Sequence, residues 1–118
     1  MALPPGVSSH HTVWVHHGTD HPAHVRYAVD GERLVCFGDG ELSSVPDGTH
    51  VSASVHEIAG GPQLASFGAT LRTIPPEQVG TNTLVEVIGH VPLGRTTAEV
   101  ESGIERYRNS RRIVELVP

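Results

Sequence analysis

The sequence predicts one mainly β domain: an antiparallel β-barrel of about six strands, with two helices flanking it near the C-terminus. The chain has 118 residues, which is the usual size of a single domain. Short segments that alternate apolar and polar residues, separated by Gly, Pro and Asp turns, occupy its first part. Helical patterns are confined to residues 75–110, which argues against a doubly wound fold.

Five strands are expected first, after a loose lead-in at residues 1–10. They cover residues 12–17, 23–29, 32–38, 49–58 and 63–74. Asp30-Gly31 is a strong hairpin signal between the second and third strands. Gly68, inside the fifth strand, predicts a bulge or a close backbone approach. Because short turns join neighbouring strands, we expect an antiparallel meander that closes into a barrel and so removes exposed sheet edges.

The helical part follows, and then a last strand. One helix is expected from Pro75-Pro-Glu77 to about Val91. Thr96 or Thr97 can cap a second helix, which is expected to end near Asn109. Residues 111–117 read as the closing strand. Four arginines, Arg106, Arg108, Arg111 and Arg112, are expected to form ion pairs with glutamates on a solvated helix face.

The amino-acid composition disfavours several classes of function. The net charge is −5, and the eight basic residues are all arginines with no basic run. Binding to nucleic acid or to an anionic membrane surface is therefore disfavoured. No apolar run approaches the roughly 20 residues needed to span a bilayer, and no signal peptide is recognisable, so a cytoplasmic location is predicted. Cys36, the single cysteine, lies in an apolar strand and is expected to be buried and inert.

The residues from Trp14 to Ile74 carry a resemblance to a known family. A turn ending in Pro22-Ala-His24 precedes a strand, a hairpin and a strand over residues 25–38, and Val51-Ser-Ala-Ser-Val-His56 follows. This pattern resembles the FMN-binding split β-barrel of pyridoxamine 5'-phosphate oxidase-like proteins. The resemblance implies a flavin-type oxidoreductase that uses FMN or a deazaflavin. It also implies a homodimer with sites at the interface, and a small-molecule substrate or a nicotinamide cofactor.

The resemblance also implies which residues bind the cofactor. Carried over by position, they are His24, Arg26, Phe37, Gly38, Asp39, Ser43 and Ser44. A flavin phosphate needs a bidentate cation and several hydroxyl or backbone donors, which Arg26 and the two serines could provide. No catalytic residue is assigned. Relatives that bind FMN usually carry a basic residue where this chain has the acidic loop at 39–44, so a deazaflavin or no cofactor is the alternative.

Two further functions remain open. The acidic loop favours a non-catalytic module that binds a cofactor or small molecule at a degenerate flavin site. Pro46-Asp-Gly-Thr-His50 is similar to the second metal-binding motif of cupins, but the first motif, a His-x-His pair, is missing. A cupin-like metal protein is therefore the lesser alternative, and no metal ligand is assigned. Most of the nine histidines are expected to face solvent or to form hydrogen bonds.

Overall fold

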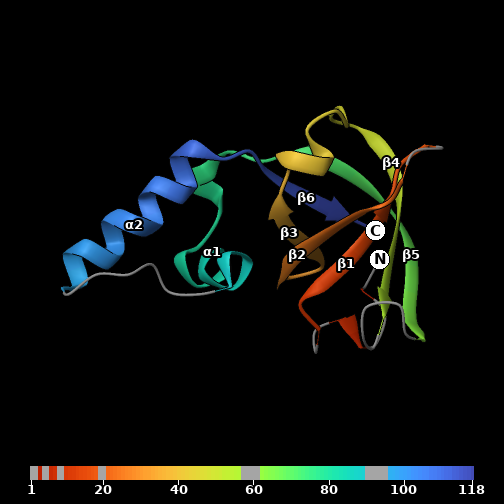
Figure 1. The fold of residues 1–118 in the computed structure, drawn as a ribbon, viewed down its shortest axis with the longest axis horizontal. Coiled ribbons are helices and arrows are strands. Elements are labelled where there is room, and N and C mark those ends of the chain that lie inside the picture. The colour runs from red at the N-terminus through yellow and green to blue at the C-terminus, as the bar shows by residue number, and fades with distance from the viewer. Residues whose placement is uncertain (1–2, 4–5, 8–9, 19–20, 57–61, 90–95) are drawn as a thin grey trace.

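Six antiparallel strands form a closed barrel, as the sequence predicted (Figure 1). The computed structural model describes residues 3, 6–7, 10–18, 21–56, 62–89 and 96–118. The strands are β1 (Thr12–His16), β2 (Ala23–Asp30), β3 (Arg33–Phe37), β4 (Thr49–His56), β5 (Gln63–Thr73) and β6 (Ile113–Val117). Their order around the barrel is β1-β2-β3-β6-β5-β4.

Two pairings close the barrel. Strand β1 pairs with both β2 and β4, so that Trp14 lies opposite His24 on one side and Ser54 on the other. Strand β6 lies between β3 and β5, with Leu116 opposite both Leu34 and Leu71. The β2–β3 hairpin turns at Gly31, whose positive φ of 64° suits glycine and confirms the predicted turn.

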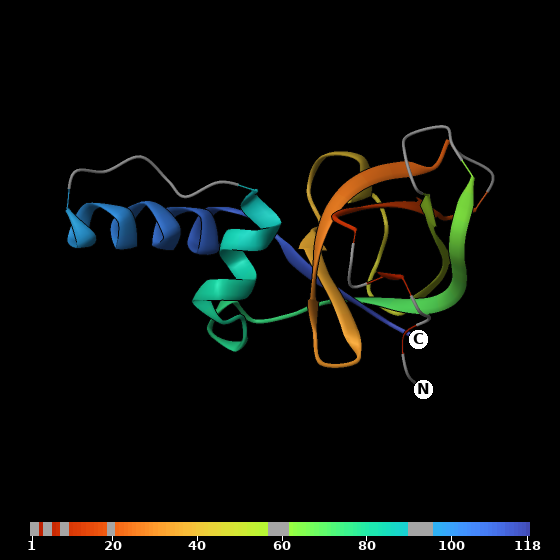
Figure 2. The same cartoon turned by 90° about the horizontal axis from the view of Figure 1, so that it is seen from below.

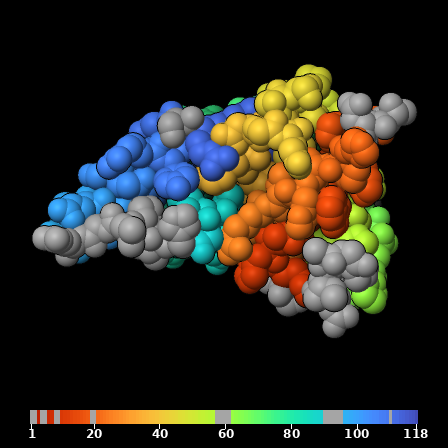
Figure 3. Space-filling view, viewed as in Figure 1, coloured from red at the N-terminus to blue at the C-terminus, as the bar shows by residue number. Residues whose placement is uncertain are grey.

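The apolar side chains form two clusters. One fills the barrel and consists mainly of Val, Leu and Ala from all six strands. The other lies outside the barrel wall, where Ala28, Val35 and Ile113 pack against Leu84 and Ile104 of the helices. The helices therefore cover the β2–β3–β6 side, and β4 and β5 lie on the opposite side (Figure 2). The helical part projects from the barrel as a narrower end (Figure 3).

The first expected helix is shorter than the sequence suggested. Residues Pro76–Gln78 form only a 3-10 turn, and helix α1 (Thr81–Ile88) begins after Gly80, whose backbone is extended. Gly89, with a φ of 88°, ends α1 by donating its N–H to the carbonyl of Val85. The expected end near Val91 lies outside the described residues.

The second helix, α2 (Thr97–Ser110), is capped as predicted: the N–H of Glu99 donates to Thr96 Oγ1 at 3.2 Å. The bulge expected at Gly68 is wrong, because Gly68 pairs regularly with Ser52. The register shift lies instead at Val55/His56 in β4. The expected extension of that strand to residues 57–58 lies outside the described residues.

Cys36 is buried inside the barrel, as expected, and burial raises the pKa of its thiol to about 12. At pH 8 roughly one part in ten thousand of such a thiol is ionised, and only the thiolate is a good nucleophile. We expect the native protein to resist a disulfide-exchange reagent such as DTNB, and to react with it at the rate of global unfolding. A thiol-release assay in rising urea measures this, and rapid labelling without urea would contradict it.

Candidate functional site

A cavity of about 290 Å³ lies between the barrel wall and the two helices. Its walls come from β2, β3, α1, α2 and the segments that flank β3 and β6. They combine aliphatic, aromatic and charged side chains: Val25, Arg26, Phe37, Asp39, Val87, Ile88, Tyr107 and Arg111. Three of these residues, Arg26, Phe37 and Asp39, are among the seven that the family resemblance implied.

Side chains alternate between the inner and outer faces of each strand, and this explains which residues of the barrel wall line the cavity. Along β2, Ala28 packs under the helices, whereas Arg26, two residues earlier, is exposed at the edge of the helical cover. On β3, Val35 and Phe37 also pack against the helical cluster. The side chains that line the cavity therefore lie where the helical cover of the barrel ends.

Arg111 occupies one side of the cavity and is held by two neighbours. Its Nε and Nη2 donate to the two carboxylate oxygens of Asp39, both at 2.7 Å. Its guanidinium carbon lies 4.0 Å from the ring centroid of Phe37, a cation–π arrangement. Hydrogen bonding to Arg111 lowers the pKa of the Asp39 carboxyl, so Asp39 is ionised at neutral pH. Asp39 and Arg111 thus form a bidentate pair in which both groups carry charge.

Arg26 lies on the other side of the cavity, at the C-terminal end of α1. Its Nε donates to the carbonyl oxygen of Glu86 at 2.8 Å, which favours a cation at the negative end of the helix. A Cβ at Gly89 would lie 2.7 Å from this Nε, so Arg26 also packs closely on the helix end. Within the described chain its two Nη atoms have no hydrogen-bond partner. Four N–H donors of Arg26 therefore remain for a ligand.

His24 lies outside the cavity, two residues before Arg26 on the same outward face of β2. Its ring stacks on that of Trp14, with 4.3 Å between centroids and 13° between planes. Its backbone N–H donates to Glu41 Oε2 at 2.9 Å. Trp14 lies half-buried on the outer face of β1. The two stacked rings extend the surface beside Arg26.

The other implied residues do not line the cavity. Gly38 is buried against β6, where an added Cβ would come within 2.4 Å of Val114 Cγ1. Ser43 Oγ donates to the carbonyl of Gly40 at 2.7 Å and closes the 3-10 turn Gly40–Leu42. Ser44 is exposed. Gly38 and Ser43 therefore have roles in the local structure, and neither serine supplies a donor to the cavity.

Sequence reasoning missed Arg111 as a cavity residue because it grouped the C-terminal arginines with nearby glutamates. Arg108 fits that interpretation, pairing with Glu105 at 2.9 Å. Arg111 and Arg112 pair instead with Asp39 and Asp47, which lie far away in the sequence. The available signal was their position at the start of a closing strand, where a side chain can reach the loop after β3.

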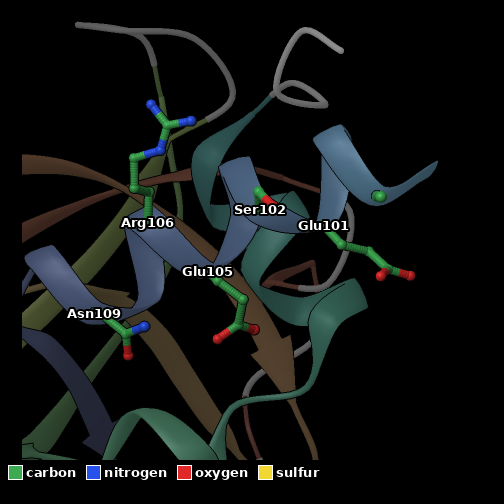
Figure 4. A pocket seen from close by; sticks show the side chains of 6 residues that line it. Glu101, Ser102, Glu105, Arg106 and Asn109 are labelled. Atoms are coloured by element: carbon green, nitrogen blue, oxygen red, sulfur yellow. The ribbon is translucent and has the colours of Figure 1, made fainter. Parts of the chain in front are cut away.

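A second hollow, of about 650 Å³, follows one face of α2. All six residues that line it belong to this helix: Ala98, Glu101, Ser102, Glu105, Arg106 and Asn109. Figure 4 shows Glu101 and Glu105 pointing to one side of the face and Arg106 to the other. Because one helix alone supplies the lining, this is an open helix surface, and the cavity beside Arg26 is the better candidate site.

The cupin-like alternative gains no support from the position of His50. This residue lies exposed on the outer face of β4, with its Nδ1 3.4 Å from Thr70 Oγ1, whereas a cupin-like site would need it inside the barrel. Over the described ranges no three His, Cys, Asp or Glu side chains are grouped to hold a metal ion. In the same part of the chain, no helix is both long and apolar enough to cross a bilayer.

Comparison of the chain with protein-family models, with curated proteins and with solved structures gave no match. The resemblance to the pyridoxamine 5'-phosphate oxidase-like family therefore stays a prediction from the sequence. The features that bear on function are the barrel and the chemistry of the cavity, which has apolar and aromatic walls, one paired guanidinium and one whose remaining donors have no partner among the described residues.

Proposed function

We propose that this protein binds a flavin-type cofactor, FMN or a deazaflavin, at the cavity between β2, β3 and the helices. The observation that carries the proposal is the edge of Arg26 that has no partner among the described residues, beside the aromatic walls of Phe37 and Tyr107. A guanidinium edge suits a phosphate or carboxylate, and the rings suit a planar aromatic group. The cavity fits one part of a flavin, and the Trp14–His24 stack supports the remainder along β2.

In this proposal the chain's own residues bind and orient the cofactor. Arg26 binds the anionic group, while Val87 and Ile88 of α1 exclude water from the ring. The bound flavin would supply hydride or electron transfer with a small molecule or a nicotinamide cofactor. Asp39 is ionised and paired, so it is a poor proton donor, and no residue is assigned an acid–base role.

The proposed active form is a homodimer. The barrel side formed by β1, β4 and β5 is not covered by the helices (Figures 1 and 2). Its centre carries small, uncharged residues, with the exposed Ser52 opposite Gly68 and the exposed Ser66 opposite the buried Ser54. Uncharged, closely approachable surfaces suit the centre of an interface between identical copies. The mass of the protein in solution tests this part of the proposal directly.

A non-catalytic binding module is the second candidate, and the size of the cavity favours it. Its volume of about 290 Å³ lies at the lower limit of ligand sites, which are commonly roughly 300–1,000 Å³. A small aromatic or aliphatic acid would fill it without extending along β2. This candidate requires ligand binding at the same residues but no redox chemistry.

A flavin titration distinguishes the two functions. Trp14 is the single tryptophan of the chain and stacks on His24, so its fluorescence reports binding beside Arg26. We expect FMN or a deazaflavin to bind at about one per chain, and FMN to bind about ten-fold more tightly than riboflavin, which lacks the phosphate. FAD is titrated in parallel. Failure of all four to bind would contradict the flavin proposal and leave the binding module.

The Arg26→Ala variant identifies the phosphate contact. We expect it to abolish the preference for FMN over riboflavin, whereas mere loosening of α1 would weaken both ligands alike. Arg72→Ala is the matched control, because Arg72 is an exposed arginine on β5 whose side chain makes no hydrogen bond among the described residues and lies outside this cavity. An unchanged preference in Arg26→Ala would remove Arg26 from the phosphate site.

A further inference from the structure

The two guanidinium groups of the cavity differ in their partners: Arg111 is paired with a carboxylate of the chain, whereas Arg26 donates to a backbone carbonyl. Asp39 takes the Nε–Nη2 edge of Arg111 through two hydrogen bonds of 2.7 Å. This is the edge that a ligand carboxylate or phosphate would use for bidentate binding. Among the described residues, Arg26 uses only its Nε, on the carbonyl of Glu86.

The charge balance of the cavity follows from this arrangement. Its charged lining residues are Arg26, Arg111 and Asp39, so two positive charges and one negative charge leave a net charge of +1. A ligand with one negative charge is matched by this balance. A phosphate monoester carries about two negative charges above its second pKa of roughly 6, and it would place the second beside the carboxylate of Asp39.

We propose that Asp39 is the specificity-determining residue of this cavity, which therefore selects ligands with a single negative charge, carboxylates or phosphodiesters, over phosphate monoester dianions. The inference rests on the proposed function, in that the cavity must bind a small anionic molecule. Within the flavin class it ranks FMN, whose phosphate is a monoester, below a cofactor whose phosphate is a diester: Arg26 still favours FMN over uncharged riboflavin, and Asp39 limits that gain.

The surroundings of the Asp39–Arg111 pair indicate where Arg111 would lie, and how stable the fold would be, without Asp39. Arg111 stays over the ring of Phe37, which holds it in the cavity independently of Asp39. The two partners are 37% and 38% exposed, so the pair is screened by solvent and its loss should cost the fold little. The Asp39→Asn variant should therefore fold and present a second guanidinium edge to the ligand.

The test compares two probes that share one aromatic ring and differ in charge. The full-length protein is titrated with phenyl phosphate and with methyl phenyl phosphate at pH 8, by calorimetry. We expect the wild type to bind the diester at least as tightly as the monoester. In Asp39→Asn the monoester should gain about ten-fold in affinity relative to the diester, because a nearby negative charge has been removed. Asp39→Ala should act in the same direction, since alanine cannot accept hydrogen bonds from Arg111.

Glu105→Gln is the matched control. It removes the same charge and one arginine ion pair of 2.9 Å, but Glu105 does not line this cavity. Its ratio of monoester to diester affinity should equal that of the wild type. The Nε–H signal of Arg111 in a nitrogen-15 NMR spectrum should shift with phenyl phosphate in Asp39→Asn more than in the wild type.

The outcomes separate the two proposals. An unchanged affinity ratio in Asp39→Asn and Asp39→Ala, or an equal change in Glu105→Gln, would overturn the inference. So would the failure of both phenyl compounds to bind any variant. If no flavin binds but the ratio changes as expected, the flavin proposal fails and the role of Asp39 stands. If flavins bind and the ratio does not change, the flavin proposal survives and Asp39 has only a structural role.

Discussion

Replacement of Arg112 by methionine is expected to lower the free energy of unfolding by about 3 kcal/mol, because one guanidinium holds the whole loop between β3 and β4. Arg112 makes five hydrogen bonds of 2.8 to 3.2 Å, to the oxygens of Gly38, Leu42, Val45, Asp47 and Thr73. Its side chain is only 24% exposed. Methionine keeps much of the apolar stem but leaves the three carbonyl groups without this donor.

The loss is measured by urea unfolding, followed by circular dichroism and by Trp14 fluorescence. For a domain of this size the melting temperature should fall by roughly 10 °C. Arg72→Met is the control and should change stability by less than about 0.5 kcal/mol, as surface substitutions usually do. Arg112→Lys should recover only a part of the loss, because an ammonium group cannot reproduce the planar fork. A loss below about 1 kcal/mol in Arg112→Met would contradict this role.

The Gly38→Ala substitution is expected to destabilise the protein by about 2 kcal/mol through overpacking. Its Cβ would lie 2.4 Å from Val114 Cγ1, a distance that real Cβ contacts do not show. Val114 of β6 is fully buried in the barrel. The N–H of Gly38 donates to the carbonyl of Arg112 at 2.7 Å, so the segment after β3 cannot easily move away from β6. The clash should therefore appear as lost stability.

A double-mutant cycle isolates this clash. Val114→Ala alone should cost stability by leaving a cavity, but in the Gly38→Ala background it also removes the clashing methyl group. The two changes together should cost at least about 1 kcal/mol less than their sum. Gly68→Ala is the control, since an added Cβ there meets nothing within 4 Å. Additive effects of the pair, or an equal loss in Gly68→Ala, would disprove the close approach at Gly38.

These two glycines show where sequence reasoning succeeds and where it stops. The alternation of apolar residues and the turn at Gly31 were enough to predict the strands, because period and turn chemistry are local properties. A close backbone approach was expected at Gly68, but it occurs at Gly38. The difference depends on which strand lies alongside, and that is a property of the closed barrel.

The residues of the candidate site also differ in whether the sequence alone could place them. Arg26 and Phe37 were implied as site residues by the family resemblance, and both lie on strands that the sequence pattern predicted. Arg111 could not be placed in this way, because its partner Asp39 is 72 residues away and the two meet only when β6 is in place. The extent of α1 was also missed: apolar spacing suggested one helix from Pro75, whereas Gly80 is extended and delays the helix to Thr81.

The position of β6 has a consequence for how the protein acquires its binding site. Although β6 is the last barrel strand in sequence, it lies between β3 and β5, and Arg33 reaches Glu115 across 82 residues of chain. Until residues 113–117 insert, both neighbouring strands have open edges, and contacts of such long range slow folding. Arg111 lies two residues before this strand, so barrel closure and completion of the cavity occur together. A chain interrupted before residue 111 would therefore lack both a closed barrel and the cavity's second guanidinium.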